Sequence, residues 1–123
     1  MITAVAKARL RPVVRALLHD LVAEEFGLQF LDEATERLLA RIRGMPPHLG
    51  GGMAMLTLMW DLSSVAEVGH RAHQLAPSLR RERFASWKTG PVGPCRDWTQ
   101  FYEKMGVFVF FSTMEDHGQH VEL

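Results

Sequence analysis

Apolar residues recur every three or four positions over residues 10–25, the spacing of one face of an α-helix. This face comprises Leu10, Val13, Val14, Leu17, Leu18, Leu21 and Val22. Pro12 has no backbone N–H and fits best in the first turn, so we expect the helix to begin at or near it. We expect Phe26 and Gly27 to end this helix, because glycine readily adopts the left-handed conformation of a C-terminal cap.

A second helix is predicted from about Asp32 to Gly44. Asp32 is a favourable N-cap, and the acidic residues that follow it suit the positive end of the helix dipole. Arg41 and Arg43 lie in the last turn, where the dipole favours cations, and Gly44 ends the pattern. The apolar stripe of this helix comprises Ala34, Leu38, Leu39 and Ile42.

Residues 53–62 are apolar on nearly every side, which predicts a buried central helix. The preceding Pro46-Pro47 can open a helix. Gly50–Gly52 stand between the two, and each glycine costs roughly 1 kcal/mol inside a helix relative to alanine. Two interpretations stay open: a flexible loop, or a helical segment that another backbone approaches closely.

The second half of the chain predicts two further helices and a tail. Its segments are a short helix or loop over Ser63–His73, a helix from Pro77 to about Lys88, a break at Gly90–Pro94, and a helix from about Cys95 to Ser112. No segment alternates with a period of two for long enough to predict a strand. We therefore expect an all-α compact bundle of five to six helices, as a single domain over residues 1–112 followed by a polar tail over 113–123.

Composition agrees with one small domain. The chain has 123 residues, of which 47% are apolar and 23% charged, with a formal net charge of zero and one cysteine. A single cysteine excludes a disulfide framework. No apolar stretch approaches the roughly 20 residues that span a bilayer, and the first residues lack the pattern of an export signal. We expect a cytoplasmic protein with no membrane span.

Charge patterning gives little reason to expect a nucleic-acid partner. Lys7, Arg9, Arg11 and Arg15 all precede the first acid, Asp20, so the start of the chain is locally basic. No aromatic residue is interleaved with these charges, and a solvated helical face is the preferred interpretation.

No catalytic, cofactor-binding or metal-ligating set emerges. His70 with His73, and His117 with His120, are spaced to share a helix face, but two ligands do not make a zinc site. Cys95 has no histidine at a spacing that nominates a base for it. Asp61 lies within the apolar segment, where a carboxylate needs a partner, and we expect an arginine.

More apolar surface is present than a bundle of this size can cover. A domain of about 120 residues buries only about 65% of the surface of its unfolded chain, so both Met53–Trp60 and Val107–Phe111 cannot be enclosed completely. An exposed apolar patch usually marks a surface for a partner.

The order of features in residues 45–113 resembles a known family. These features are Pro46-Pro47, the apolar helix, Leu75-Ala76-Pro77 opening an arginine-rich helix that ends in Phe84-Ala85-Ser86-Trp87, and a last helix with Arg96 at its start and Val107–Ser112 at its close. The chain is similar to the small subunits of glucose–methanol–choline type flavoprotein dehydrogenases, such as gluconate 2-dehydrogenase subunit 3. It also resembles the N-terminal helical region of long-chain alcohol oxidases.

The resemblance implies a non-catalytic accessory subunit that binds and stabilises a larger catalytic subunit. FAD is then expected in that partner, within a heteromer, and no cofactor in this chain. The expected interface residues are Trp87, Arg96, Tyr102, Phe108, Phe110 and Phe111.

The sequence is also compatible with two other functions. The first is a self-associating helical domain in which the methionine-rich segment Met53–Met59 lines a pocket for a hydrophobic small molecule. The second is a metal-dependent enzyme built on the two histidine pairs.

Overall fold

In a computed structural model of the chain, residues 4–23 and 28–118 are described. The elements are α1 (Ala4–Leu18), a π-helical turn η1 (His19–Ala23), α3 (Leu31–Arg43), α4 (Pro47–Val68), a short 3₁₀ turn η2 (Ala72–Gln74), α5 (Pro77–Lys88) and α6 (Gly93–Asp116). The described ranges hold five α-helices and no strand, which confirms the all-α prediction.

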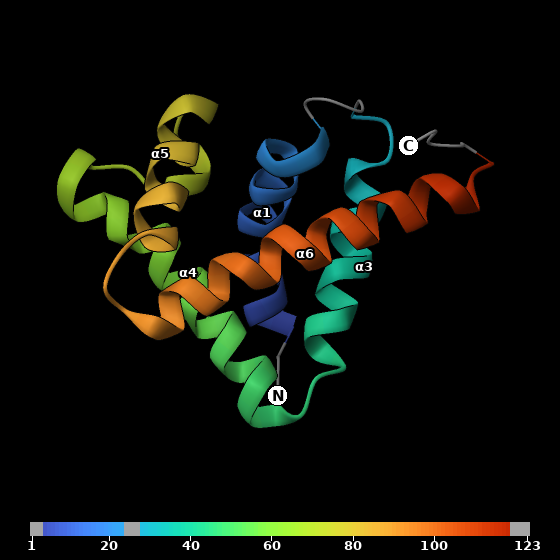
Figure 1. The fold of residues 1–123 in the computed structure, drawn as a ribbon, viewed down its shortest axis with the longest axis horizontal. Coiled ribbons are helices and arrows are strands. Elements are labelled where there is room, and N and C mark those ends of the chain that lie inside the picture. The colour runs from blue at the N-terminus through green and yellow to red at the C-terminus, as the bar shows by residue number, and fades with distance from the viewer. Residues whose placement is uncertain (1–3, 24–27, 119–123) are drawn as a thin grey trace.

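Helix α6 lies across the other helices (Figure 1). Its first half packs against α5 and α4, and its second half packs against α3. Helix α1 contacts α3 and α4 as well as α6 and so occupies the middle of the bundle. In the part of the chain that is described, no helix is long and apolar enough to cross a membrane.

Large aromatic side chains join α4, α5 and α6. Trp60, Trp98, Tyr102 and Phe110 are fully buried. The Trp98 ring contacts those of Trp60 and Tyr102, with centroids 5.5 and 5.0 Å away. Aromatic pairs at these separations contribute beyond their buried area, so the cluster is a major source of the fold's stability.

The first helix begins earlier than predicted. Pro12 was expected in its first turn, but α1 starts at Ala4 and Pro12 lies inside it. The residues before Pro12 include Ala4, Ala6 and Ala8, and alanine is the strongest helix former. The expected cap at Phe26 and Gly27 lies outside the described residues.

Helix α3 has the predicted extent but a different N-cap. The cap is Phe30, whose side chain makes no capping hydrogen bond, and Asp32 lies in the first turn. Asp32 instead accepts a hydrogen bond from Arg15 of α1, at 2.7 Å. Gly44 caps the other end, as predicted, in a right-handed conformation.

The three glycines are helical, which settles the question that the sequence left open. Helix α4 opens at Pro47 and contains Gly50–Gly52. A Cβ placed on Gly50 would lie 2.7 Å from the carbonyl oxygen of Ile42. The glycine therefore allows the end of α3 to come close to the α4 backbone.

Helix α6 extends beyond both predicted bounds. It begins at Gly93 within the expected break and continues to Asp116. Thr113 and Met114, which were assigned to the polar tail, are buried on the side of the helix that faces the core. Thr113 donates a hydrogen bond to the carbonyl of Val109, so its hydroxyl is satisfied within the helix.

Candidate functional site: the exposed face of α4 and the adjoining groove

Helix α4 exposes a row of large apolar side chains. Met55, Met59, Leu62 and Val65 retain 62%, 51%, 52% and 44% of their accessible surface. Positions 55, 59 and 62 follow the i, i+4, i+7 spacing of one helix face, and Val65 continues it at i+10. We call these four residues the α4 apolar face.

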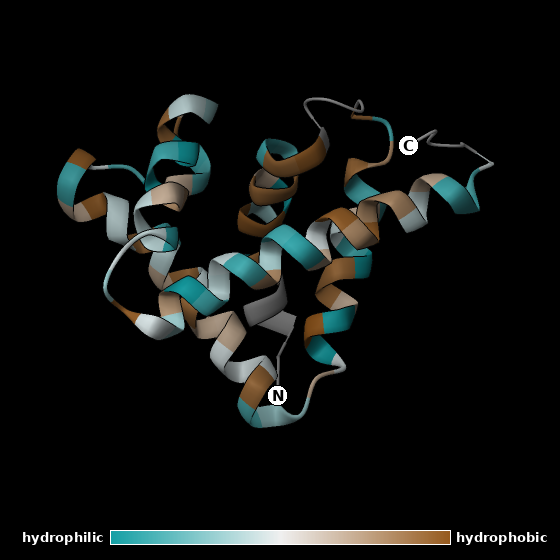
Figure 2. Ribbon diagram, in the orientation of Figure 1, coloured by the Kyte–Doolittle hydropathy of each residue, from teal (hydrophilic) through white to brown (hydrophobic). Residues whose placement is uncertain are grey.

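The prediction of a buried central helix was wrong for this side of α4. The buried side consists of small or polar residues at positions 50, 54, 57, 61 and 64, together with Trp60. Small residues allow close approach of the neighbouring helices, whereas the bulky methionines and leucines project outward. Beyond its first turn, the N-terminal half of α4 carries apolar or neutral colour and little hydrophilic colour (Figure 2).

No charge interrupts the α4 apolar face. Between Pro47 and Ala66 the only ionisable residues are His48 and Asp61, and Asp61 is buried. Exposed helix faces normally carry charged residues, so an uncharged apolar face of nearly three turns is typical of a surface that another molecule covers.

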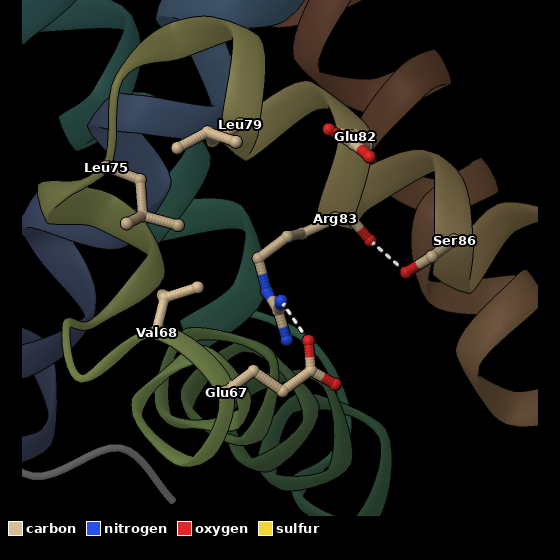
Figure 3. A pocket seen from close by; sticks show the side chains of 7 residues that line it. All are labelled: Glu67, Val68, Leu75, Leu79, Glu82, Arg83 and Ser86. Carbon is tan, nitrogen blue, oxygen red and sulfur yellow. Dashed lines mark hydrogen bonds and ion pairs between the residues drawn. The ribbon is translucent and has the colours of Figure 1, made fainter.

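The face continues into a groove between the end of α4 and α5. The groove has a volume of about 380 Å³ and is lined by Glu67, Val68, Leu75, Leu79, Glu82, Arg83 and Ser86 (Figure 3). Val65 and Val68 are one turn apart, so the apolar surface is continuous from the face into the groove.

Arg83 lines this groove and pairs with a carboxylate across it. Its Nη1 donates to Glu67 Oε2 at 2.7 Å, and Figure 3 shows its side chain reaching from α5 toward α4. Its Nε is buried and has no acceptor among the described residues. A buried donor left unpaired costs about 1–3 kcal/mol, so the Glu67 pair holds Arg83 in this position at a cost to the fold.

Two of the six predicted interface residues are core residues. Tyr102 and Phe110 are fully buried, so neither presents surface to a partner. Burial also raises the pKa of Tyr102 above its ordinary value, because the ionised phenolate cannot be solvated there.

The other four are accessible but do not form one surface. Trp87 is half-buried with its ring against Trp98, and the exposed Arg96 donates to the carbonyl of Gly90 at 2.8 Å. Phe108 is exposed beneath the guanidinium of Arg41, and Phe111 is half-buried. Arg96 and Phe108 stand twelve residues apart on α6, or about 18 Å along its axis.

Of the two predicted histidine pairs, only the first lies wholly within the described residues, and its two members have different contacts. His70 is exposed, whereas His73 bonds to Asp61. His117 lies 2.8 Å from Glu33, and this hydrogen bond lowers the pKa of the Glu33 carboxyl; His120 lies outside the described residues. Within residues 4–23 and 28–118, no three His, Cys, Asp or Glu residues are grouped so that they could hold a metal ion.

Cys95 is half-buried at the start of α6. It lines a cavity of about 220 Å³ with Trp87, Pro91 and Val92 among its neighbours. No base is among the residues that line this cavity.

The expected arginine partner of Asp61 is confirmed. Arg71 Nε donates to Asp61 Oδ2 at 2.6 Å, and the Asp61 side chain has no solvent exposure. Asp61 also accepts from the backbone N–H of His73 and contacts the His73 ring, both at 2.8 Å. No local pattern pointed to this histidine, because it lies twelve residues away across a turn.

Comparisons of the chain with protein-family models, with curated proteins and with solved structures returned no significant match. The resemblance in residues 45–113 therefore stays a prediction.

Proposed function

We propose that this chain is a non-catalytic helical accessory subunit that binds and stabilises a larger FAD-dependent oxidoreductase of the alcohol- or sugar-oxidising type. The observation that carries the interaction is the α4 apolar face, which is uncharged and leads into the groove beside Arg83. The resemblance described above supports the flavoprotein as the partner.

The mechanism is stabilisation by linkage. A subunit that binds only the folded partner shifts that partner's folding equilibrium toward the native state, by about 2.7 kcal/mol when its free concentration is 100 times the dissociation constant. Methionine suits such a surface, because its flexible thioether side chain adapts to irregular shapes. No residue of this chain need touch the flavin.

Charge substitutions on two different surfaces test where the partner docks. Met59→Asp places a carboxylate in the centre of the α4 apolar face, and we expect it to abolish co-purification with the flavoprotein. Gln100→Asp introduces the same charge at an exposed position of α6 and is the matched control. Phe108→Asp tests the predicted surface around the end of α6, and we expect the complex to survive it.

The alternative is a domain that self-associates through the same face and binds a hydrophobic small molecule. An uncharged face is compatible with a second copy of the chain. Met53–Met59, however, line neither the groove beside Arg83 nor the cavity at Cys95, because Met55 and Met59 point outward. A homodimer that dissociates on Met59→Asp, with no larger chain bound, would favour the alternative.

A further inference from the structure

A separate cavity of about 410 Å³ lies between α1, the region of η2 and the start of α5. It is lined by Pro12, Arg15, Ala16, His19, His73, Pro77 and Arg80. None of these residues belongs to the α4 apolar face or lines the groove of Figure 3.

Two Asp–His couples meet at this cavity. His73 Nδ1 lies 2.8 Å from Oδ1 of Asp61, and His19 Nδ1 lies 3.0 Å from Oδ1 of Asp20. Both carboxylates are buried or nearly so. Each couple holds its imidazole by Nδ1 and leaves Nε2 without a partner among the described residues.

Arg80 joins the two couples. Its Nε and Nη2 donate to the two oxygens of Asp20, at 2.8 and 2.6 Å, and Nη2 also lies 3.3 Å from His19 Nδ1. Its Nη1 donates to the backbone carbonyls of His73 and Leu75, at 3.4 and 3.2 Å. All three of its nitrogens have protein partners, so Arg80 positions both imidazoles and adds positive charge.

The charges around the cavity are arranged with the cations at its wall. The charged and titratable residues that line the cavity or contact the two Asp–His couples are Arg15 of α1, His19 and Asp20 of η1, Asp61 of α4, Arg71 before η2, His73 of η2 and Arg80 of α5. Arg15 pairs with the exposed Asp32. Three arginines thus balance three carboxylates, and each histidine that takes up a proton adds one positive charge.

The start of α5 favours an anion at the same place. Pro77, the first residue of α5, lines the cavity, so the positive end of this helix dipole lies at its wall. The N-cap, Ala76, makes no side-chain hydrogen bond to the first turn. The π-helical turn η1 presents His19 and Asp20, and such turns occur frequently at functional sites.

We propose that this cavity binds a tetrahedral oxyanion, a sulfate or phosphate group, either free or carried by a small molecule. Protonated His19 and His73 donate to it through Nε2, and Arg15 exchanges its exposed partner Asp32 for the anion. The volume lies in the range of small-molecule sites. Pro12, Ala16 and Pro77 provide apolar wall for an organic part of the ligand.

Sulfate is the direct probe, because its charge does not change over the pH range in which imidazole titrates. The full chain is titrated with sodium sulfate at constant ionic strength, with sodium chloride as balance, while the imidazole NMR signals are followed. We expect saturable binding that weakens by about tenfold or more as rising pH removes the imidazole protons. His19→Gln and His73→Gln should each weaken it by about tenfold, and His48→Gln, an exposed histidine of α4, should leave it unchanged.

Three results would overturn the proposal: a response to sulfate no larger than to chloride, affinity independent of pH, or equal losses in His48→Gln and His73→Gln. If His73→Gln fails to fold, His19→Gln carries the test, since Arg80 still pairs with Asp20 in that variant. Inorganic phosphate compared with a phosphate monoester then separates the two sources of the anion. Tighter binding of the ester indicates an organic ligand, and equal binding indicates the free anion.

Discussion

The hydroxyl of Tyr102 lies 2.7 Å from Oγ1 of Thr57 in the centre of the core, and this contact ties α6 to α4. Thr57 donates its own hydroxyl proton to the carbonyl of Met53, at 2.7 Å, so Tyr102 must be the donor in their hydrogen bond. Trp98 Nε1 donates to the same oxygen at 3.0 Å. Thr57 therefore satisfies two buried aromatic donors at once.

Removing this hydroxyl should destabilise the fold. Thr57→Val keeps the shape of the side chain but leaves the donors of Tyr102 and Trp98 unpaired, and we expect a loss of about 2–4 kcal/mol in the free energy of unfolding. Thr57→Ser retains the hydroxyl and serves as the control. Urea denaturation measures both, and equal stability of the two variants would show that the network contributes nothing.

Tyr102 also predicts a loss of stability at high pH. Its pKa in the folded state is raised above the value of about 10 in the unfolded chain, so its contribution is fully present below about pH 10 and is lost as pH rises through the folded value. Tyr102 is the chain's one tyrosine, so tyrosinate absorbance should appear only as the protein unfolds. Stability that falls as steeply above pH 10 in Tyr102→Phe would assign the effect to other groups.

The neighbouring glycines of α4 should respond to alanine with opposite signs. Gly50→Ala brings a Cβ within 2.7 Å of the Ile42 carbonyl, and the overlap should cost about 1–3 kcal/mol. Gly52→Ala meets nothing within 4 Å and should stabilise the helix by up to about 1 kcal/mol. Thermal unfolding of both variants checks this, and a stabilised Gly50→Ala would contradict the close approach of α3 and α4.

Arg80 should matter far more to stability than another cation of the same helix. Arg80→Met leaves Asp20 nearly buried without its main partner, and we expect a loss of about 3–5 kcal/mol. Lys88→Met removes a solvent-exposed pair with Glu103 and should cost no more than about 1 kcal/mol. Similar losses in the two variants, measured by chemical denaturation, would mean that the Asp20 pair is not tightly coupled to folding.

Local patterns predict most of the helices and their order. Where the observed bounds differ from the predicted ones, the difference has a physical cause. Helix α3 was predicted nearly to the residue, because its apolar spacing, charges and terminal glycine agree. The start of α1 was missed, since the helical preference of the preceding alanines outweighs the loss of one hydrogen bond at Pro12. The need for glycine at position 50 comes from its close approach to the Ile42 carbonyl, a contact between two helices that no local sequence pattern predicts.

The candidate site was located only in part. Met55 and Met59 stay exposed, as expected for a bundle of this size, but the exposed side of α4 was not identified from the sequence. The signal was present: positions 50, 54, 57, 61 and 64 carry Gly, Ala, Thr, Asp and Ser at the 4-3-4-3 spacing of a closely packed face. Tyr102 and Phe110 were assigned to an interface because apolar residues suit core and interface equally, and only the packing of α6 against its neighbours separates the two roles.

The partnership is tested most directly by purifying the tagged chain from its native cells and following flavin absorbance during size exclusion. We expect the chain to elute together with a larger, flavin-bearing polypeptide. We also expect Met59→Asp to elute alone and folded, whereas Gln100→Asp stays in the complex. A colourless peak at the mass of one or two copies of the wild-type chain would contradict the proposed function, and an intact complex with folded Met59→Asp would contradict docking through α4.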